Sequence, residues 1–211
     1  MKKATLLLFA IPILLVQTGC FSIGSGRKSP PPRFTLTAKR PAPQAFASTV
    51  VTNNLLVIGR VKASRSTEGN TISMVDADSG RFGVFDQGAF AFPIDFIVDR
   101  ATRNWLARSN KFGTVVDSSI APRVKERTML ECWIEQFGLQ RKRGKWSAVI
   151  ELHYLVQYPG GDYREIPILV PTDVDTPIRD KAPTINDVLM AFNHGLENAM
   201  EKLEDALEGE E

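Results

Sequence analysis

Hydrophobic and polar residues alternate most regularly in the second half of the chain. Every second residue from 146 to 158 is apolar or aromatic, and most residues between them are polar. A period of two predicts a β-strand with one packed face and one wetter face. The run at 128–141 is also strand-like and connects to it through a hairpin turn at 143–144. A turn at 159–162 then leads into a third strand at 163–170, which completes a predicted antiparallel meander.

Shorter β-like runs precede this meander. The run from 55 to 61 is apolar and β-branched, as central strands are, and the runs at 71–75 and 81–85 follow it across polar turns. Residues 112–116 form another short run, and 34–36 is a candidate edge strand. The sequence therefore predicts a sheet of several strands that is mostly antiparallel.

Two segments change to the period of about 3.6 residues that marks an amphipathic helix. The first follows Pro93, which suits a first helical turn because its missing N–H costs nothing there. The second begins near Thr184, a candidate N-cap with Asp187 in the capping-box position. The apolar stripe of the first segment is Ile94, Ile97, Val98, Ala101 and Trp105. The stripe of the second is Ile185, Val188, Leu189, Phe192, Leu196, Ala199, Met200, Leu203 and Leu207.

Each predicted helix has a single apolar stripe, and the predicted sheet has one apolar face. Burying these surfaces against one another gives an α+β fold, a two-layer sandwich with both helices on one face of the sheet. We expect one such domain over residues 49–208, followed by an acidic tail at 209–211. Gly195 costs the second helix about 1 kcal/mol relative to alanine, which suggests close packing at that point.

The first residues have the composition of a secretory signal. Lys2 and Lys3 form a basic start, and an apolar run follows from 4 to 16. This run is shorter than the ~20 apolar residues that cross a bilayer as a helix. We expect residues 1–19 to be removed as a signal peptide.

The end of this signal, Thr18-Gly19-Cys20, resembles a bacterial lipobox, with Gln17 where such boxes usually carry leucine. Cleavage after Gly19 would make Cys20 the acylated first residue of the mature protein. The alternative is an ordinary signal peptide with a chance cysteine. Residues 20–48 are rich in glycine, serine, proline and alanine, a composition that buries little apolar area and predicts a flexible tether.

Charge and cysteine content limit the partners and the chemistry. The formal net charge of +2 includes the two signal-peptide lysines, so the mature chain is close to neutral and offers no electrostatic reason to expect nucleic acid. With Cys20 acylated, Cys132 has no intramolecular disulfide partner. Its apolar strand predicts a buried thiol that packs as a small hydrophobe; the alternatives are an intermolecular disulfide or a reactive site.

Candidate catalytic and metal-binding residues are few. The sequence contains no G-x-S-x-G, H-E-x-x-H or C-x-x-C motif and no phosphate-binding glycine loop. Its two histidines, His153 and His194, have no neighbouring ligand at metal spacing and are expected at the surface. Asp173 and Asp175 lack the ligand set of a calcium site and are expected in a solvated turn. We therefore expect no catalytic site, no metal and no other cofactor.

One charged cluster is a candidate contact surface. Arg141, Lys142, Arg143 and Lys145 surround the tip of the predicted hairpin. On an exported, lipid-anchored protein, such a cluster is suited to anionic head groups or to an acidic partner. The alternative is a charged turn that keeps the hairpin soluble.

The order of these features has a counterpart in a known family. A lipobox and tether are followed by the aromatic-x-Leu run at 34–36 and by strands at 55–63 and 81–85. Then come the helix start at 92–94, the link at 109–112 and a closing amphipathic helix. This order resembles the ABC-type transport auxiliary lipoprotein family, which includes the paraquat-inducible C lipoprotein. The likeness covers nearly all of the mature chain as a diffuse pattern.

The resemblance implies a periplasm-facing lipoprotein that serves an ABC transporter with a mammalian-cell-entry (MCE) domain protein, moving lipids between membranes. Its partners would be the MCE protein and the ABC permease and ATPase, and it would act by docking or recruitment without catalysis. Acyl chains on Cys20 would hold it at the membrane. Phe21 after the cysteine favours the periplasmic face of the outer membrane.

Two other functions stay open. One is a stand-alone envelope-assembly or lipid-binding lipoprotein, which predicts an exposed apolar groove or patch. The other is a periplasmic hydrolase built from scattered groups such as Asp95, Ser147 and His153, which requires polar residues close together in a concave site.

Overall fold

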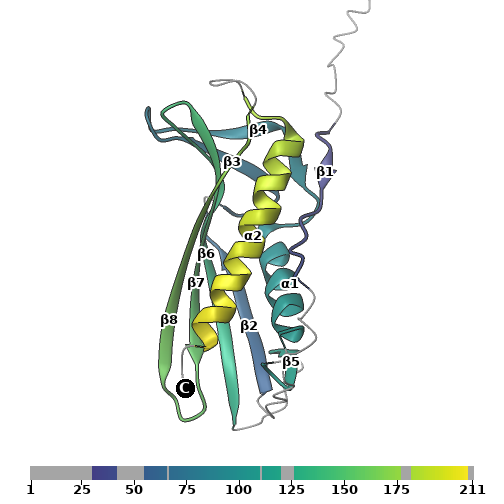
Figure 1. Ribbon diagram of the computed structural model, residues 1–211, viewed down its shortest axis with the longest axis vertical. Helices are drawn as coiled ribbons and strands as arrows, with labels where there is room; N and C mark the ends of the chain where they lie inside the picture. The colour runs from purple at the N-terminus through teal and green to yellow at the C-terminus, as the bar shows by residue number, and fades with distance from the viewer. Residues whose placement is uncertain are drawn as a thin grey trace, which may run out of the picture. The chain divides into compact units, whose positions relative to one another are not determined.

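The structure, a computed structural model, describes residues 30–41, 55–65, 67–109, 111–119, 126–176 and 182–208. The chain divides into two units, Met1–Pro30 and Pro31–Glu211, and the described secondary structure lies in the second. The described part of this unit forms one eight-stranded sheet and two helices (Figure 1). The predicted signal peptide, with Gly19 and Cys20, lies outside the described residues.

The predicted antiparallel meander is confirmed. It consists of β6 (Arg127–Lys142), β7 (Lys145–Gln157) and β8 (Tyr163–Asp173), each paired antiparallel with the next. The β6–β7 turn places Arg143 at φ 52° and Gly144 at φ 74°. Two successive positive φ values are typical of the tight hairpin turn whose twist matches that of the flanking strands.

The long strand β6 joins two parts of the sheet. Its first half pairs with β2 (Leu55–Ala63) and its second half with β3 (Thr71–Asp76), and both pairings are parallel. The link between β2 and β3 is fixed where β6 is irregular, because the Ser64 hydroxyl donates to the carbonyl of Glu135 at 3.1 Å. Period-two patterns specify which face of a strand is buried but not its neighbours, so the parallel pairings were not predicted.

Three shorter pairings complete the sheet. Strand β4 (Arg81–Phe90) is antiparallel to β3, and β1 (Arg33–Phe34) is parallel to β4. Strand β5 (Thr114–Asp117) is parallel to β2. The sheet is therefore mixed, although most of its paired residues lie in antiparallel ladders. Strand β4 extends beyond the predicted run at 81–85 because its second half pairs with β1, which sequence periodicity does not reveal.

Both predicted helices are present and cover the same face of the sheet (Figure 1). Helix α1 spans Ile94–Ala107 with Pro93 at its N-cap, and its predicted stripe is buried. Helix α2 spans Ile185–Glu208. The predicted capping box is confirmed, since the Thr184 N–H donates to Asp187 Oδ2 at 3.1 Å and the Asp187 N–H donates to Thr184 Oγ1 at 3.4 Å. The predicted α+β sandwich is thus confirmed.

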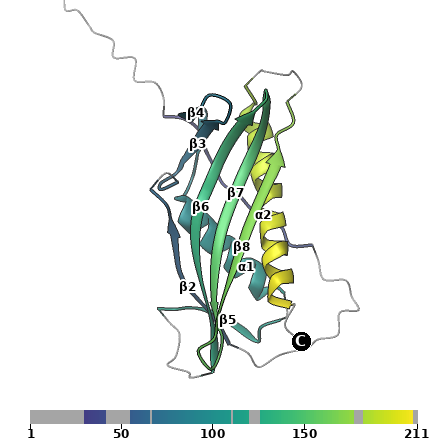
Figure 2. The same cartoon turned by 90° about the vertical axis from the view of Figure 1, so that its left-hand side faces the viewer.

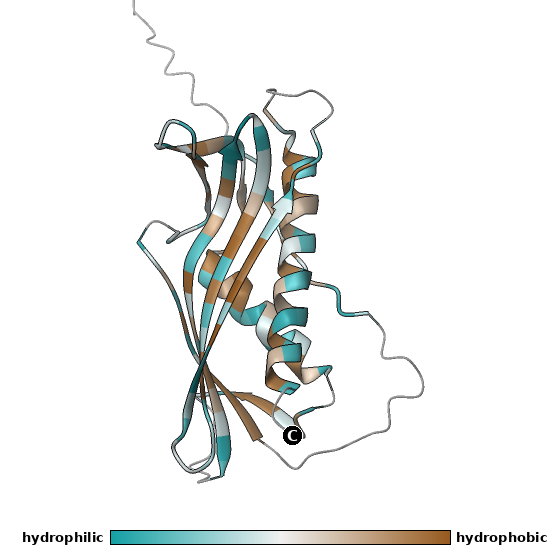
Figure 3. Cartoon of the chain, turned by 60° about the vertical axis from the view of Figure 1, so that its left-hand side comes forward, coloured by the Kyte–Doolittle hydropathy of each residue, from teal (hydrophilic) through white to brown (hydrophobic). Residues whose placement is uncertain are grey.

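The core between α2 and the sheet contains three aromatic rings. Phe137 stacks on Phe192 with ring centroids 5.1 Å apart, and Phe90 meets both rings edge-on. Gly195 brings α2 close to the sheet, because a Cβ there would lie 2.9 Å from Thr172 Oγ1. Figure 3 shows the resulting alternation of apolar and polar residues along β6, β7 and β8. This packing fixes the positions of the two helices on the sheet, and the helices in turn position the residues at 33–40 that lie between them.

Candidate functional site

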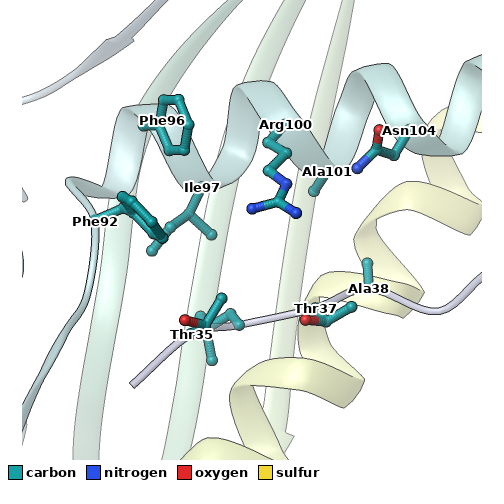
Figure 4. Close-up of a pocket in the computed structure, with 10 residues that line it drawn as sticks. Thr35, Thr37, Ala38, Phe92, Phe96, Ile97, Arg100, Ala101 and Asn104 are labelled. Carbon is teal, nitrogen blue, oxygen red and sulfur yellow. The ribbon is translucent and has the colours of Figure 1, made fainter. Parts of the chain in front are cut away.

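The residues that lead into the folded unit lie between the two helices. We call residues 33–40 the strap; it belongs to the segment that the sequence assigns to the tether. The strap and α1 enclose a small cavity of about 50 Å³ (Figure 4). The cavity is lined by Thr35, Leu36, Thr37 and Ala38 of the strap and by Phe92, Phe96, Ile97, Arg100, Ala101 and Asn104.

One end of this groove is aromatic and the other is polar. Phe92 and Phe96 are 40% and 47% exposed, and their ring centroids lie 5.1 Å apart. Arg100 follows one helical turn later and points toward the strap (Figure 4). Within the described residues, its guanidinium has no hydrogen-bond or ion-pair partner. The groove therefore offers a bound group an aromatic surface at one end and guanidinium hydrogen-bond donors at the other.

The strap is held to α2 by a ladder of hydrogen bonds. The Thr37 N–H donates to Asn193 Oδ1 and the Lys39 N–H donates to Glu197 Oε1, each at 2.9 Å. These acceptors, four residues apart, lie on the same side of the helix. The side chains of α2 therefore satisfy alternate backbone donors of the strap, as a neighbouring strand would in a sheet.

The ladder ends in a buried carboxylate. Glu204, 8% exposed, accepts from Arg40 Nη2 at 2.7 Å and Nε at 3.2 Å, and from Trp105 Nε1 at 2.6 Å. Burial raises the pKa of Glu204, but the hydrogen bonds from Arg40 and Trp105 and the nearby positive charges outweigh it, so the pKa lies below its ordinary value. Glu204 is thus held ionised and connects the strap to both helices.

Lys111 adds a second positive charge to this cluster. Its Nζ lies 3.5 Å from Glu204 Oε1, and it also forms an ion pair with Glu208. Burial lowers the pKa of Lys111, and the charge of Glu204 only partly opposes that shift. Nothing in the local sequence pattern predicts that Arg40, Lys111 and Glu204 come together. The one available signal was Glu204 beside Leu203 at the edge of the apolar stripe, where a charge requires a partner.

The predicted basic tip lies at the β6–β7 turn, far from the C-terminal end of α2, where Glu204 lies (Figure 1). Lys142, Arg143 and Lys145 are exposed, and the Arg143 N–H donates to Asp78 Oδ2 at 2.5 Å. Arg141 lies with its guanidinium carbon 5.8 Å from the centre of the Trp146 ring. The acidic β3–β4 turn therefore offsets part of the positive charge of the tip.

The other candidates are dispersed. His153 Nε2 lies 3.7 Å from Glu151 Oε1 on the sheet face away from the helices, and His194 is exposed on α2. Asp95 belongs to α1, across the sheet from Ser147 and His153, so the structure does not bring this hydrolase set together. In the described ranges, no three His, Cys, Asp or Glu side chains are grouped to hold a metal.

Cys132 is buried, as predicted. Burial raises the pKa of its thiol to about 12, so at neutral pH it is protonated and a poor nucleophile. Neither helix in the described residues is long and apolar enough to span a membrane.

Comparisons with known proteins place the fold. No family model and no curated protein matches the chain. A Xanthomonas campestris protein of the DUF330 family matches with a TM-score of 0.64 at 16% identity, over 81% of this chain and 91% of that chain. A crystal structure of an uncharacterized protein matches with a TM-score of 0.61 at 15% identity, over 84% and 98% of the two chains. The described unit therefore has the fold of a solved DUF330 protein.

Proposed function

We propose that this chain is a lipid-anchored, non-catalytic accessory subunit of an ABC-type transport system. In this proposal it recruits or positions an MCE-domain protein, with its ABC permease and ATPase, for lipid transfer between membranes. It acts at the periplasmic face of the outer membrane. Acyl chains on Cys20 provide the anchor, because two or more chains hold a protein stably where one chain is marginal.

The observation that carries the proposal is the attachment of the strap. An accessory subunit that holds a partner near a membrane needs a firm connection between its anchor and its folded body. Here the segment that follows the predicted anchor is fixed to α2 by Asn193, Glu197 and Glu204. Glu204 also binds Trp105 of α1, so a pull on the strap is shared by both helices.

Two further features support the proposal. The predicted order of strands and helices, on which the resemblance to the auxiliary lipoproteins rests, is the order in the structure. The cavity beside the strap has an aromatic pair and an arginine, a combination suited to holding a partner. In the proposal, Arg141, Lys142, Arg143 and Lys145 contact anionic head groups or an acidic partner.

The test is purification of the tagged full-length chain from membranes of its native host in mild detergent. We expect mass spectrometry to identify an MCE-domain protein, a permease and an ATPase with it, and to find Cys20 acylated. The Cys20→Ala variant, which has no sulfur to acylate, should leave the membrane fraction and lose these partners. Repeated recovery of acylated protein without an MCE partner would contradict the transport role.

A further inference from the structure

The sheet has a face that neither helix covers. In Figure 2, β6, β7 and β8 lie in front of both helices, with this face toward the viewer. We call the outward residues of these three strands the open face. Register places Trp133, His153 and Pro167 in one row across the strands, and Glu131, Leu155 and Glu165 in the next. The open face therefore has a defined residue map, and its centre lies at these two rows.

The centre of the open face carries the apolar side chains of Trp133 and Leu155, where a sheet face in contact with water usually carries polar ones. Trp133 and Leu155 are half-buried although no described element covers them. At the margins, Tyr163 is 63% exposed and Leu169 is 54% exposed. The face is also hollowed, by a cavity of about 280 Å³ lined by Trp133, Glu135, His153, Tyr154, Leu155 and Glu165. Contiguous exposed apolar surface with a polar border is typical of interaction sites.

The charged side chains in the two central rows of β6, β7 and β8 are both glutamates, Glu131 and Glu165. The side-chain carboxylates of Glu131, Glu135 and Glu165 have no ion-pair or hydrogen-bond partner within the described residues, and that of Glu151 has only His153, at 3.7 Å. No lysine or arginine occupies an outward position in these two rows. The neighbouring residues Glu135 and Glu151 are also acidic.

Positive charges lie along the border of this region: the exposed Arg60 of β2 is beside Glu131, and Arg127 lies at the start of β6 on the outward side. Lys62 of β2 lies in register with Trp133 on the side away from β7. Lys142 and Lys145 form the last pair at the hairpin end of the strands. Four unneutralised or weakly paired carboxylates around a tryptophan favour a cationic occupant, because opposite potentials attract and the indole face itself binds cations.

The outer edge of β8 is not built for strand addition. Pro167 and Pro171 interrupt it, and proline has no N–H to donate to a new strand. The Leu169 carbonyl between them already accepts from Lys202 Nζ at 3.1 Å. A partner therefore has to lie across the open face, where side chains make the contacts.

We propose that the open face binds a cationic segment of a partner protein, in which lysine or arginine side chains flank an apolar residue. The apolar residue packs against Trp133 and Leu155, and the cations pair with the surrounding glutamates. This inference rests on the proposed function, since it names the chemistry of the partner that an accessory subunit would recruit. It adds a second contact surface on the side of the sheet opposite the strap.

The test uses the full-length acylated protein in nanodiscs and a fluorescein-labelled peptide of alternating lysine and leucine. A peptide of alternating glutamate and leucine is the probe control. Fluorescence anisotropy should show binding of the lysine peptide that weakens with salt, and little binding of the glutamate peptide. The double variant Glu131→Gln/Glu165→Gln should weaken binding by up to about fivefold for each carboxylate removed.

The matched control is Glu201→Gln/Asp205→Asn, which removes two exposed carboxylates from α2 and should leave binding unchanged. Equal loss in both double variants, or none in either, would overturn the proposal. A benzophenone side chain in place of Leu155 should cross-link the lysine peptide, and one in place of His194 should not. Cross-linking from both positions or from neither would also overturn it.

A second copy of this chain is the competing occupant. If the protein self-associates in sedimentation and Glu131→Gln/Glu165→Gln abolishes this association, the open face is a self-interface and the proposal fails. The peptide experiment uses purified protein alone, so it is independent of whether an MCE partner is recovered from membranes. Failure of either proposal can therefore be recognised without the other.

Discussion

The indole N–H of Trp105 donates to Glu204 Oε2 at 2.6 Å, joining α1 to α2 across 99 positions of the chain. The same carboxylate receives Arg40 from the strap, so three segments meet at one buried negative charge. A carboxylate in this position stabilises the fold only while it is ionised and all its donors are present. The first two predictions follow from this dependence.

Replacing Glu204 by glutamine should make stability less dependent on pH. The pKa of Glu204 lies below its ordinary value of 4.5 in the folded state, so its contribution is complete above 4.5 and is lost as pH falls through the folded value. At neutral pH we expect Glu204→Gln to lower the free energy of unfolding by about 1.5–3 kcal/mol. Denaturant titrations should show that the difference in the free energy of unfolding between the native protein and Glu204→Gln becomes smaller at acid pH. The control Glu201→Gln, at an exposed position, should have the same free energy of unfolding as the native protein. A difference for Glu204→Gln that stays constant with pH would contradict a stabilising role for the ionised Glu204.

Replacing Arg40 by lysine should loosen the strap without unfolding the sheet. Lysine keeps the charge but does not reproduce the two-pronged contact that Arg40 makes with Glu204. We expect the amides of Thr37 and Lys39 to exchange hydrogen about tenfold faster or more, as measured by hydrogen-exchange mass spectrometry. Lys39→Ala, which keeps the backbone donor to Glu197, is the control and should change little. Unchanged exchange in Arg40→Lys would show that the clamp does not hold the strap.

Thiol labelling should distinguish the two cysteines. Cys132 is buried and its pKa is raised to about 12, so an alkylating reagent at mildly alkaline pH should not modify it until the protein is unfolded. In protein from the native host, Cys20 should not react even in denaturant, because its sulfur carries the acyl chain. Intact mass should therefore show one label after unfolding and none before. A second label in denaturant would show that Cys20 is free.

Replacing Gly195 by alanine should destabilise the protein although alanine is the better helix former. The new Cβ would lie 2.9 Å from Thr172 Oγ1 and 3.3 Å from Ile150 Cδ1, so α2 has to move off the sheet. Overpacking of about 1–3 kcal/mol exceeds or cancels the gain of about 1 kcal/mol from helix propensity, giving a net loss of up to about 2 kcal/mol. Calorimetry should show a lower Tm than for His194→Ala, a change at the exposed neighbouring position. A higher Tm for Gly195→Ala would contradict the close approach.

The sequence predicted the elements with strong local periodicity. The stripe from Ile94 to Trp105 specifies α1, and the alternation that begins at Trp146 specifies β7, because both patterns repeat within a few residues. The Thr184–Asp187 capping box and the close packing at Gly195 were also predicted, since each depends on chemistry visible at a single place in the chain. Fold class followed from adding these local patterns together.

The contacts that define the candidate sites could not be predicted in this way. Arg40 and Glu204 meet across 164 positions, and neither the strap nor the tether-like composition around it marks Arg40 as special. The open face is similar, since Glu131, Leu155 and Glu165 are brought into one row only by strand register. Period-two alternation predicts which side chains of each strand lie on its outward face, but it does not predict which strands are neighbours in the sheet.

The chain alone thus determined where most of its helices and strands form and which surfaces of each are apolar, and it predicts an export signal at its N-terminal end. The tertiary structure decided that β6 is flanked by β2, β3 and β7, that the strap lies between the helices, and that a buried carboxylate fastens it. The division has a physical cause. Local patterns are set by backbone geometry over one or two turns, whereas strand order, burial of charge and long-range hydrogen bonds are settled only when distant segments exclude water together.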